Sequence, residues 1–218
     1  MAEGRGRFIT LEGPDGSGKS TQAERLVAGL RDAGFSVTPT REPGGTPLGE
    51  RVRQILLHAA ELRPAPATDV LLFNAGRAQQ VAEVIRPALD RGDVVVCDRY
   101  ADSTLAYQGY GSGQPLESLR AVEAFTIDAV RPDLTILLDL PPELGLARRR
   151  TAGANRFEEQ FDLAFHRRVR EGYLALAAAE PDRFVVIDAS GPPEVVAVAV
   201  REAAARLLPE LRAPIGRP

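Results

Sequence analysis

A glycine-rich run near the start of the chain contains the residue types that bind phosphate groups. It matches G-x-x-x-x-G-K-[ST] and, with the threonine that follows, consists of Gly13, Pro14, Asp15, Gly16, Ser17, Gly18, Lys19, Ser20 and Thr21. Glycines let the backbone wrap around a phosphate with its N–H groups pointing inward, in conformations that other residues resist. In such a loop Lys19 reaches the β and γ phosphates of a nucleoside triphosphate, and the Ser20 hydroxyl binds Mg²⁺. The alternative is a glycine-rich turn without a ligand.

Lys19 is the one lysine among the 27 basic residues of the chain, and the others are arginines. An ammonium is a compact charge on a flexible stem, whereas a guanidinium is broad and planar. A single lysine kept inside a glycine-rich loop is typical of a position that needs the compact charge. A codon bias with one surviving lysine would give the same composition.

An acid and a base follow an apolar run in the middle of the chain. Residues 94–97 predict a buried strand, and Asp98 and Arg99 come directly after it. Beside a phosphate-binding loop, Asp98 can hold a water molecule on Mg²⁺, and Arg99 can lie between donor and acceptor phosphates. A structural ion pair between the two residues is the alternative.

Short apolar runs alternate with longer helical patterns along the chain. The runs that predict buried strands are 8–11, 37–40, 94–97, 134–138 and 184–187. The helical patterns are 20–33, 48–57, 69–89, 116–130, 142–150, 157–179 and 193–208. Strands separated by crossover helices form a parallel sheet with helices on both faces, and ligands bind at the carboxyl ends of its strands. The sequence therefore predicts an α/β fold with both motifs at such strand ends.

The composition is that of an ordinary globular protein. With 218 residues, 44% of them apolar and a net charge of −3, the chain is expected to form one domain over residues 1–218. No block of positive charge indicates a nucleic-acid polymer or a membrane as partner. One cysteine, no leader at residues 1–7 and no apolar run of ~20 residues lead us to expect a cytoplasmic protein. The tail 213–218 is expected to fray.

Several short motifs, in one order and spacing, resemble those of the bacterial thymidylate kinases. Besides the glycine-rich loop they are 40–46 (Thr-Arg-Glu-Pro-Gly-Gly-Thr), 73–77 (Phe-Asn-Ala-Gly-Arg), 98–100 (Asp-Arg-Tyr), 106–109 (Ala-Tyr-Gln-Gly), 155–158 (Asn-Arg-Phe-Glu) and 170–173 (Arg-Glu-Gly-Tyr). The resemblance implies a P-loop NTPase fold with a five-stranded parallel sheet, usually in a homodimer. It also implies conversion of dTMP and ATP to dTDP and ADP with Mg²⁺.

The resemblance implies that Phe73 stacks on the thymine ring and that Arg77 donates hydrogen bonds to the base. A flat ring and a planar fork of donors suit that task. The two residues lie four positions apart in the helical pattern 69–89. The alternative is that Phe73 is one more apolar residue of this helix and Arg77 its solvated neighbour.

Further residues are assigned to the acceptor nucleotide by the same resemblance. Tyr107 packs against the sugar and helps to reject a 2′-hydroxyl, and Asp15 accepts a hydrogen bond from the 3′-hydroxyl. Arg99 and Arg53 hold the monophosphate, and Glu42 belongs to the loop beside it. Weaker candidates for contacts near the base are Thr104 and Gln108.

An arginine-rich segment at about 148–157 joins two helical patterns around small residues. A mobile lid that brings positive charge onto a triphosphate has this composition. We expect Arg148 to offset the negative end of its helix and Arg149 and Arg156 to face the site. Some members of the family carry a catalytic arginine in the phosphate loop, where this chain has Gly16. The charge of the transition state must then be met from elsewhere, and the lid is the obvious supplier.

Two other functions share the phosphate loop. One is phosphorylation of a different nucleoside monophosphate or of a deoxynucleoside, and the other is a nucleotide-binding switch without an acceptor. Guanine-specific GTPases typically carry Asn-Lys-x-Asp, which this chain cannot form because Lys19 is its one lysine. No nucleophile or general base is required, because phosphoryl transfer depends mainly on alignment and neutralisation of charge.

Overall fold

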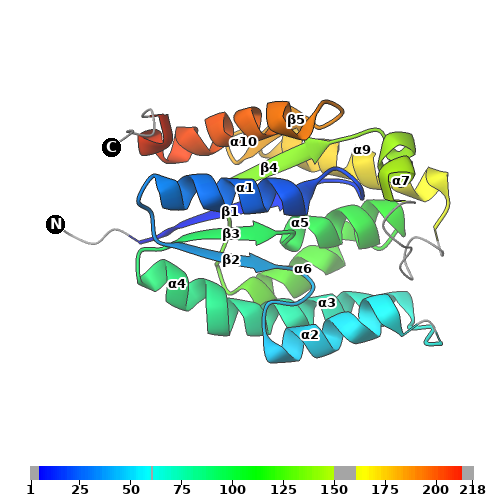
Figure 1. The fold of residues 1–218 in the computed structure, drawn as a ribbon. Helices are drawn as coiled ribbons and strands as arrows, with labels where there is room; N and C mark the ends of the chain where they lie inside the picture. Colours follow the sequence, from blue (N-terminus) through cyan, green and yellow to red (C-terminus); the bar gives the residue numbers. More distant parts are fainter. Residues whose placement is uncertain (1–4, 60, 150–160, 213–218) are drawn as a thin grey trace.

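The computed structural model describes residues 5–59, 61–149 and 161–212. Its centre is a five-stranded sheet with the order β2-β3-β1-β4-β5, in which every pairing is parallel (Figure 1). The strands are β1 (Arg7–Glu12), β2 (Val37–Arg41), β3 (Val94–Asp98), β4 (Leu134–Asp139) and β5 (Phe184–Asp188). The predicted α/β fold and all five strands are confirmed. Each strand ends one residue later than its apolar run, on a polar residue.

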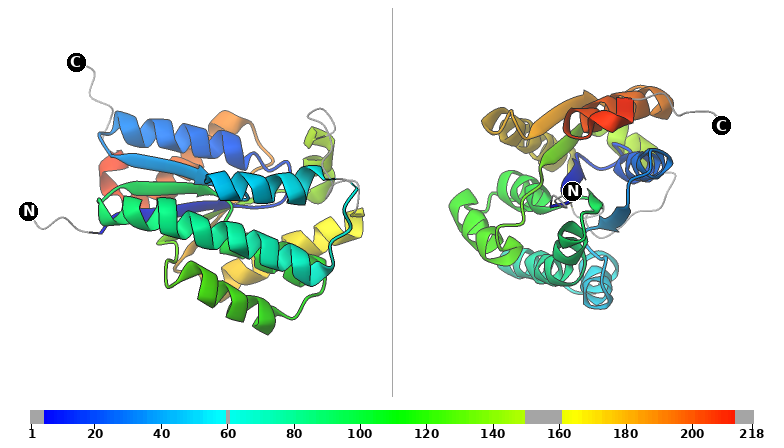
Figure 2. Two further views of the ribbon diagram at one scale, coloured as in Figure 1. Left: turned by 90° about the horizontal axis from the view of Figure 1, so that it is seen from below. Right: turned by 90° about the vertical axis from the view of Figure 1, so that its left-hand side faces the viewer.

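Helices cover both faces of the sheet (Figure 2). They are α1 (Lys19–Asp32), α2 (Pro47–Arg53), α3 (Pro66–Gln80), α4 (Arg86–Asp90), α5 (Ala101–Thr104), α6 (Leu116–Ile127), α7 (Pro142–Arg149), α9 (Leu163–Ala179) and α10 (Pro193–Leu207). Three π-helical segments continue α2, α3 and α5, namely η1 (Gln54–His58), η2 (Val81–Ile85) and η3 (Leu105–Gly111), and a 3₁₀ turn, η4 (Pro209–Arg212), follows α10. None of the described helices is long and apolar enough to cross a membrane.

Strands β1, β3, β4 and β5 each contribute to two apolar cores, because successive side chains point to opposite faces of the sheet. In β1, Ile9 and Leu11 pack with residues of α1 and α10, while Phe8 packs in a separate core on the other face. In β3, Val95 and Cys97 join Phe8. Burial of both faces explains why these strands are continuous apolar runs in the sequence.

The helices differ from the sequence prediction at several boundaries and in one segment. In the described part of the pattern 157–179, α9 begins at Leu163, because the Asp162 side chain accepts a hydrogen bond from the backbone N–H of Phe165 and so caps the first turn. The pattern 116–130 ends at Ile127, where Asp128 adopts a left-handed conformation with φ 44°. The helical segment of α5 and η3 was not predicted in the sequence analysis.

Candidate active site

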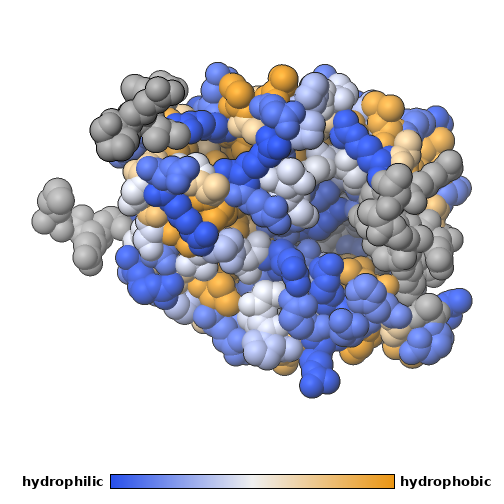
Figure 3. Space-filling model, viewed as in Figure 1, coloured by the Kyte–Doolittle hydropathy of each residue, from blue (hydrophilic) through white to orange (hydrophobic). Residues whose placement is uncertain are grey.

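The carboxyl ends of β1, β2 and β3 border a cavity of about 560 Å³. Figure 3 shows this hollow, with hydrophilic residues around it, on the face seen in Figure 1. Of the residues predicted from the sequence, the cavity is lined by Asp15, Gly16, Gly18, Lys19, Ser20, Thr21, Glu42, Arg53, Phe73, Arg77, Asp98, Arg99, Thr104, Tyr107 and Gln108. The fold therefore brings together residues from six separate stretches of the chain.

The loop between β1 and α1 has the backbone that its glycines predicted. Gly13, Gly16 and Gly18 have φ angles of 144°, 77° and 88°, which side-chain-bearing residues adopt only with strain. Lys19 folds back over this loop, and its Nζ donates to the carbonyl oxygens of Gly13 (3.0 Å) and Pro14 (2.8 Å). Burial, with a smaller contribution from Arg99, lowers the pKa of Lys19 to about 8. A phosphate group beside this buried ammonium would favour the charged form of Lys19.

Ser20 and Asp98 meet where β1 and β3 end. The Ser20 hydroxyl donates to Oδ2 of Asp98 at 2.6 Å. Within the described part of the chain, the other carboxylate oxygen of Asp98 is buried without a hydrogen-bond partner. Hydroxyl and carboxylate oxygens are the ligands that Mg²⁺ prefers. This pair, with one oxygen unsatisfied, therefore fits the predicted cation.

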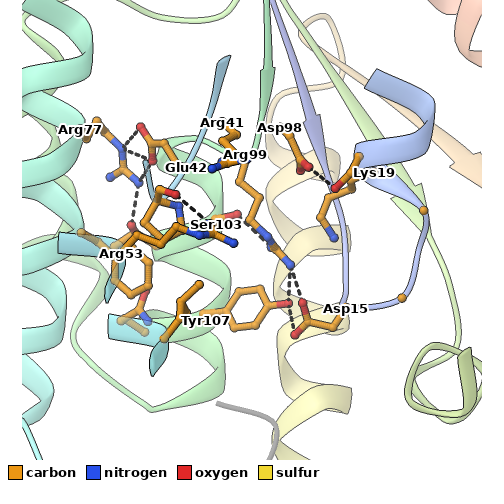
Figure 4. A pocket seen from close by; sticks show the side chains of 18 of the residues that line it. Asp15, Lys19, Arg41, Glu42, Arg53, Arg77, Asp98, Arg99, Ser103 and Tyr107 are labelled. Carbon is orange, nitrogen blue, oxygen red and sulfur yellow. Dashed lines mark hydrogen bonds and ion pairs between the residues drawn. The ribbon is translucent and has the colours of Figure 1, made fainter. Parts of the chain in front are cut away.

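Arg99 lies at the centre of the cavity, between the phosphate loop and α3 (Figure 4). Its Nη2 donates to Oδ1 of Asp15 at 2.6 Å and to the Tyr107 hydroxyl at 3.1 Å, and that hydroxyl donates to Oδ2 of Asp15 at 2.9 Å. Burial opposes the charge of Arg99, but Tyr107 and Asp15 raise the pKa of its guanidinium well above the ordinary value. The alternative of a structural Asp98–Arg99 ion pair is wrong, because the described contacts pair Arg99 with Asp15 and Asp98 with Ser20.

Arg77 is one of the most deeply buried side chains of the cavity wall, with 1% of the side chain exposed. Its Nε and Nη2 donate to the Glu42 carboxylate, and Nη2 also contacts the Tyr100 carbonyl and the Thr104 hydroxyl. Its Nη1 donates to Oδ1 of Asn74 at 3.2 Å. The alternative of a solvated Arg77 is therefore wrong. Glu42 and Thr104 hold this guanidinium, a role that the sequence analysis had not assigned to them.

The other predicted acceptor-side residues surround the same space. Phe73 is half-buried one turn of α3 before Arg77, and Gln108 is a buried residue of η3. Arg53, at the end of α2, donates from Nη1 to the Pro43 carbonyl at 2.8 Å, in the loop after β2. All three line the cavity, which agrees with an acceptor pocket between α2, α3 and η3.

The predicted lid lies largely outside the described residues. Residues 150–160, which include Arg156, are not described, and neither is the side chain of Arg149. Arg148 is described, and its guanidinium donates to the carbonyl oxygens of Ala189 and Ser190 at 3.0 Å and of Gly16 at 3.4 Å. It thus connects the end of α7 to the phosphate loop and to the loop after β5.

Three residues around Arg99 were missed in the sequence analysis, and two of them, Glu12 and Tyr173, are fully buried. Ser103 and Tyr173 accept hydrogen bonds from its Nη1, both at 3.2 Å, and Glu12 accepts hydrogen bonds from these two hydroxyls. The signals were present but weak. Glu12 is an acid at the end of an apolar strand, and Tyr173 is in a motif to which no role was given.

Comparison with known proteins agrees with this geometry. The family model described as thymidylate kinase matches residues 11–200. The thymidylate kinase of Deinococcus radiodurans is 57% identical over 188 residues, covering 86% of this chain and 91% of that protein. That of Pseudomonas fluorescens Pf-5 is 51% identical over 207 residues, covering 94% and 96%. The crystal structure of thymidylate kinase from Ehrlichia chaffeensis is 34% identical, with a TM-score of 0.75, covering 92% of this chain and 99% of that chain. Since both the family model and these relatives cover most of the chain, it belongs to the thymidylate kinase family.

Proposed function

We propose that this chain transfers the γ-phosphoryl group of ATP to dTMP and releases dTDP and ADP, as its family membership implies. The observation that carries the proposal is one continuous cavity. It joins a phosphate-binding loop at Lys19 and Ser20 to an aromatic ring and a buried guanidinium at Phe73 and Arg77. Arg99 lies between these two ends (Figure 4). A nucleotide switch would need the loop but not the second half of the cavity.

On the donor side, the loop N–H groups and Lys19 bind the β and γ phosphates of ATP. Lys19 exchanges the carbonyl oxygens of Gly13 and Pro14 for phosphate oxygens, which are stronger partners for an ammonium. Ser20 and Asp98 would hold Mg²⁺, Asp98 through a water molecule. The cation would neutralise charge on the transferring phosphoryl group.

On the acceptor side, Phe73 stacks on the base and Arg77 donates to it. Asp15 accepts from the 3′-hydroxyl, and Tyr107 packs where a 2′-hydroxyl would project. Arg99 and Arg53 bind the monophosphate. We also assign Glu42, Thr104 and Gln108 to this nucleotide. Glu42 and Thr104 hold Arg77, and Gln108 lines the cavity near the base. Together they align the acceptor oxygen with the γ phosphate, which is the main task in phosphoryl transfer.

We assign the remaining charge stabilisation to the lid. Gly16 occupies the loop position at which some family members carry a catalytic arginine, so Arg149 and Arg156 are proposed to face the transferring group. They act together with Lys19 and Arg99. Guanidinium groups delivered in this way stabilise the charge of the transition state.

The proposed function is tested by measuring ADP formation with dTMP, dUMP, dCMP, dGMP, UMP and AMP as acceptors. We expect kcat/KM to decrease from dTMP to dUMP to dCMP, with the purine nucleotides slower still. ADP released at the same rate without any acceptor would indicate a switch. A faster reaction with another monophosphate would replace dTMP as the substrate.

Arg77 supplies the sharpest version of this test. Its Nη1 carries two hydrogens, and Asn74 is its one acceptor among the described residues, so one hydrogen can reach the base. Thymine presents an acceptor at position 4, whereas cytosine presents a donor that would face this N–H. The mismatch costs on the order of 1–3 kcal/mol, or about 5- to 150-fold. We therefore expect Arg77→Ala to narrow the gap between dTMP and dCMP.

The readout is the ratio of kcat/KM for the two acceptors within one preparation. Any unfolded fraction cancels in that ratio, which matters because Arg77→Ala leaves Glu42 buried without its partner. The double variant Arg77→Ala/Glu42→Gln removes that charge and should show the same narrowed ratio. A ratio that stays at the unmodified value in both variants would show that Arg77 does not discriminate between the bases.

We also propose that two copies of the chain associate. Helices α3 and α6 pack side by side, with the Thr126 hydroxyl donating to Oδ1 of Asn74 at 2.8 Å. Next to these contacts, Leu71 is 58% exposed and Phe125 is 85% exposed. Large apolar side chains exposed on adjacent helices are typical of association surfaces. A second copy is the occupant that the family resemblance implies.

A further inference from the structure

Glu12 is a fully buried carboxylate at the end of β1, directly before the phosphate loop. It accepts three hydrogen bonds from two parts of the chain, the start of α5 and helix α9. Its Oε1 accepts from the backbone N–H of Tyr100 at 2.7 Å, and its Oε2 accepts from the hydroxyls of Ser103 at 2.6 Å and Tyr173 at 2.9 Å. A buried carboxylate with several donors fixes the orientation of each of them.

The two hydroxyls connect Glu12 to Arg99. A hydroxyl has one hydrogen, so the hydroxyls of Ser103 and Tyr173 that donate to Glu12 present lone pairs to their other neighbours. One of these neighbours is Nη1 of Arg99, which lies 3.2 Å from each hydroxyl oxygen, and the two hydroxyl oxygens also lie 2.8 Å from each other. The carboxylate therefore makes both hydroxyls acceptors toward the guanidinium.

Glu12 also holds the backbone on which Arg99 sits. Arg99 has a φ of 70°, a left-handed conformation that costs a non-glycine residue about 1 kcal/mol or more. The next backbone N–H, that of Tyr100, points at Oε1 of Glu12. The Arg99 N–H donates to the Leu11 carbonyl at 3.0 Å, so the end of β1 fixes both sides of the strained residue.

We propose that Glu12 is a positioning residue for Arg99. Its carboxylate holds the backbone turn and orients the two hydroxyls, so that the Nη1 edge of the guanidinium is anchored and the rest faces Asp15 and the acceptor phosphate. This inference deepens the proposed function and rests on it, because Arg99 has its assigned role only in that reaction. Glu12 itself is not among the residues that line the cavity.

The ionised form of Glu12 is the one that can do this. A protonated carboxyl group carries a hydrogen on one oxygen and has lost its negative charge, so it holds the three donors less strongly, and the hydrogens of the Ser103 and Tyr173 hydroxyls, whose oxygens lie 2.8 Å apart, must rearrange. Burial, together with Asp102 of α5, raises the pKa of Glu12 to about 7, while Ser103, Arg99 and Tyr100 lower it. Glu12 also interacts electrostatically with three other titratable groups, namely Lys19 of α1, Cys97 of β3 and Tyr173 of α9.

The sign of the pH effect follows from these groups. The active form is deprotonated, so activity is retained above the pKa and is lost as the pH falls through about 7. The phosphate of dTMP titrates near pH 6, but it does so identically for every variant. A difference between variants therefore reports on the protein.

The test compares pH profiles of kcat/KM for dTMP from pH 5.5 to 8.5. Glu12→Gln keeps the shape of the side chain but places an N–H₂ donor among three donors. We expect a loss on the order of 10- to 100-fold at pH 8, with KM for ATP within about twofold of the unmodified value because Lys19 and Ser20 are untouched. In the Glu12→Gln profile, the part of the decrease of kcat/KM at low pH that is due to the protein, here called the acidic limb, should disappear. Glu123→Gln, the same change at another buried glutamate whose pKa burial raises to about 8, should keep that limb.

Tyr173→Phe gives a second route to the same answer. It removes one hydroxyl between Glu12 and Arg99, so part of the effect of Glu12→Gln should already be lost in that background. We expect the double variant to lose clearly less activity than the product of the two single losses. Additive losses, or a Glu12→Gln enzyme whose acidic limb stays in place, would overturn the inference. An unmodified enzyme that does not phosphorylate dTMP would instead overturn the proposed function.

Discussion

At the residue scale, the site depends on a difference between two cations that carry the same charge. Lys19 sits inside the glycine-rich loop, where its Nζ contacts two carbonyl oxygens within 3.0 Å. Arg99 and Arg77 carry planar guanidinium groups, and each group is held by several acceptors from different elements. A compact ammonium can leave its carbonyl partners for a phosphate, whereas a guanidinium group with many hydrogen-bond partners stays in place.

This difference predicts the effect of Lys19→Arg. The broader guanidinium cannot occupy the space of the ammonium, so we expect kcat to fall by at least about 100-fold, the usual cost of losing one preorganised charge. Thermal melting should stay close to that of the unmodified protein. Arg25→Lys, the reverse change on the exposed side of α1, is the control and should leave kcat unchanged. Normal turnover of Lys19→Arg would show that the loop does not need the compact charge.

At the scale of elements, α7 packs directly on the phosphate loop. A Cβ atom at Gly145 would overlap the carbonyl oxygen of Asp15, and one at Gly16 would overlap the carbonyl oxygen of Gly145. The helix that leads into the arginine-rich segment is thus in backbone contact with the loop that binds the donor phosphates. A shift of α7 toward the loop must displace Asp15 or Gly16.

Gly145→Ala measures this contact. In an open helix the change would stabilise by about 0.5–1 kcal/mol, but here the added methyl group pushes α7 away from Asp15. Since small misplacements in an active site can cost up to about 100-fold, we expect kcat/KM for ATP to fall on the order of 10-fold or more. Gly29→Ala in α1, where the nearest atom to a Cβ is 3.9 Å away, should raise the melting temperature and leave the kinetics unchanged. Equal kinetics for the two variants would contradict the prediction.

At the scale of the whole molecule, the exposed apolar residues Leu71 and Phe125 are not among the residues that line the cavity. Association through α3 and α6 would therefore leave the nucleotide site open. It would also brace α3, the helix that carries Phe73 and Arg77.

The proposed association predicts that Phe125→Glu produces a monomer. A charge at an 85% exposed position hardly affects a monomer but is strongly unfavourable inside an apolar interface. Sedimentation velocity or light scattering of the unmodified chain should give twice the chain mass, and the variant should give one. Val198→Glu on α10, which is 60% exposed, is the control and should keep the dimer. A dimer that survives Phe125→Glu would place the interface elsewhere.

The sequence by itself determined the five strands, the parallel sheet with helices on both faces, and the phosphate loop. These features are local, because apolar runs, helical periodicity and glycine spacing are set by neighbours along the chain. The helical segment of α5 and η3 was missed for the converse reason. Most of its residues are buried and two of them are glycines, so it shows neither a polar face nor a propensity for helix.

Only the tertiary structure decided which side chains hold the site in place. Glu12 meets Tyr173 across 161 residues of sequence, and Glu42 meets Arg77 across 35. The local sequence pattern does not predict such pairs. An acid at a strand end is usually solvated, and it becomes a buried acceptor only when distant donors pack against it. The residue types that could do the chemistry were therefore visible in the sequence. Their orientation depends on contacts between distant segments, which exist only in the folded chain.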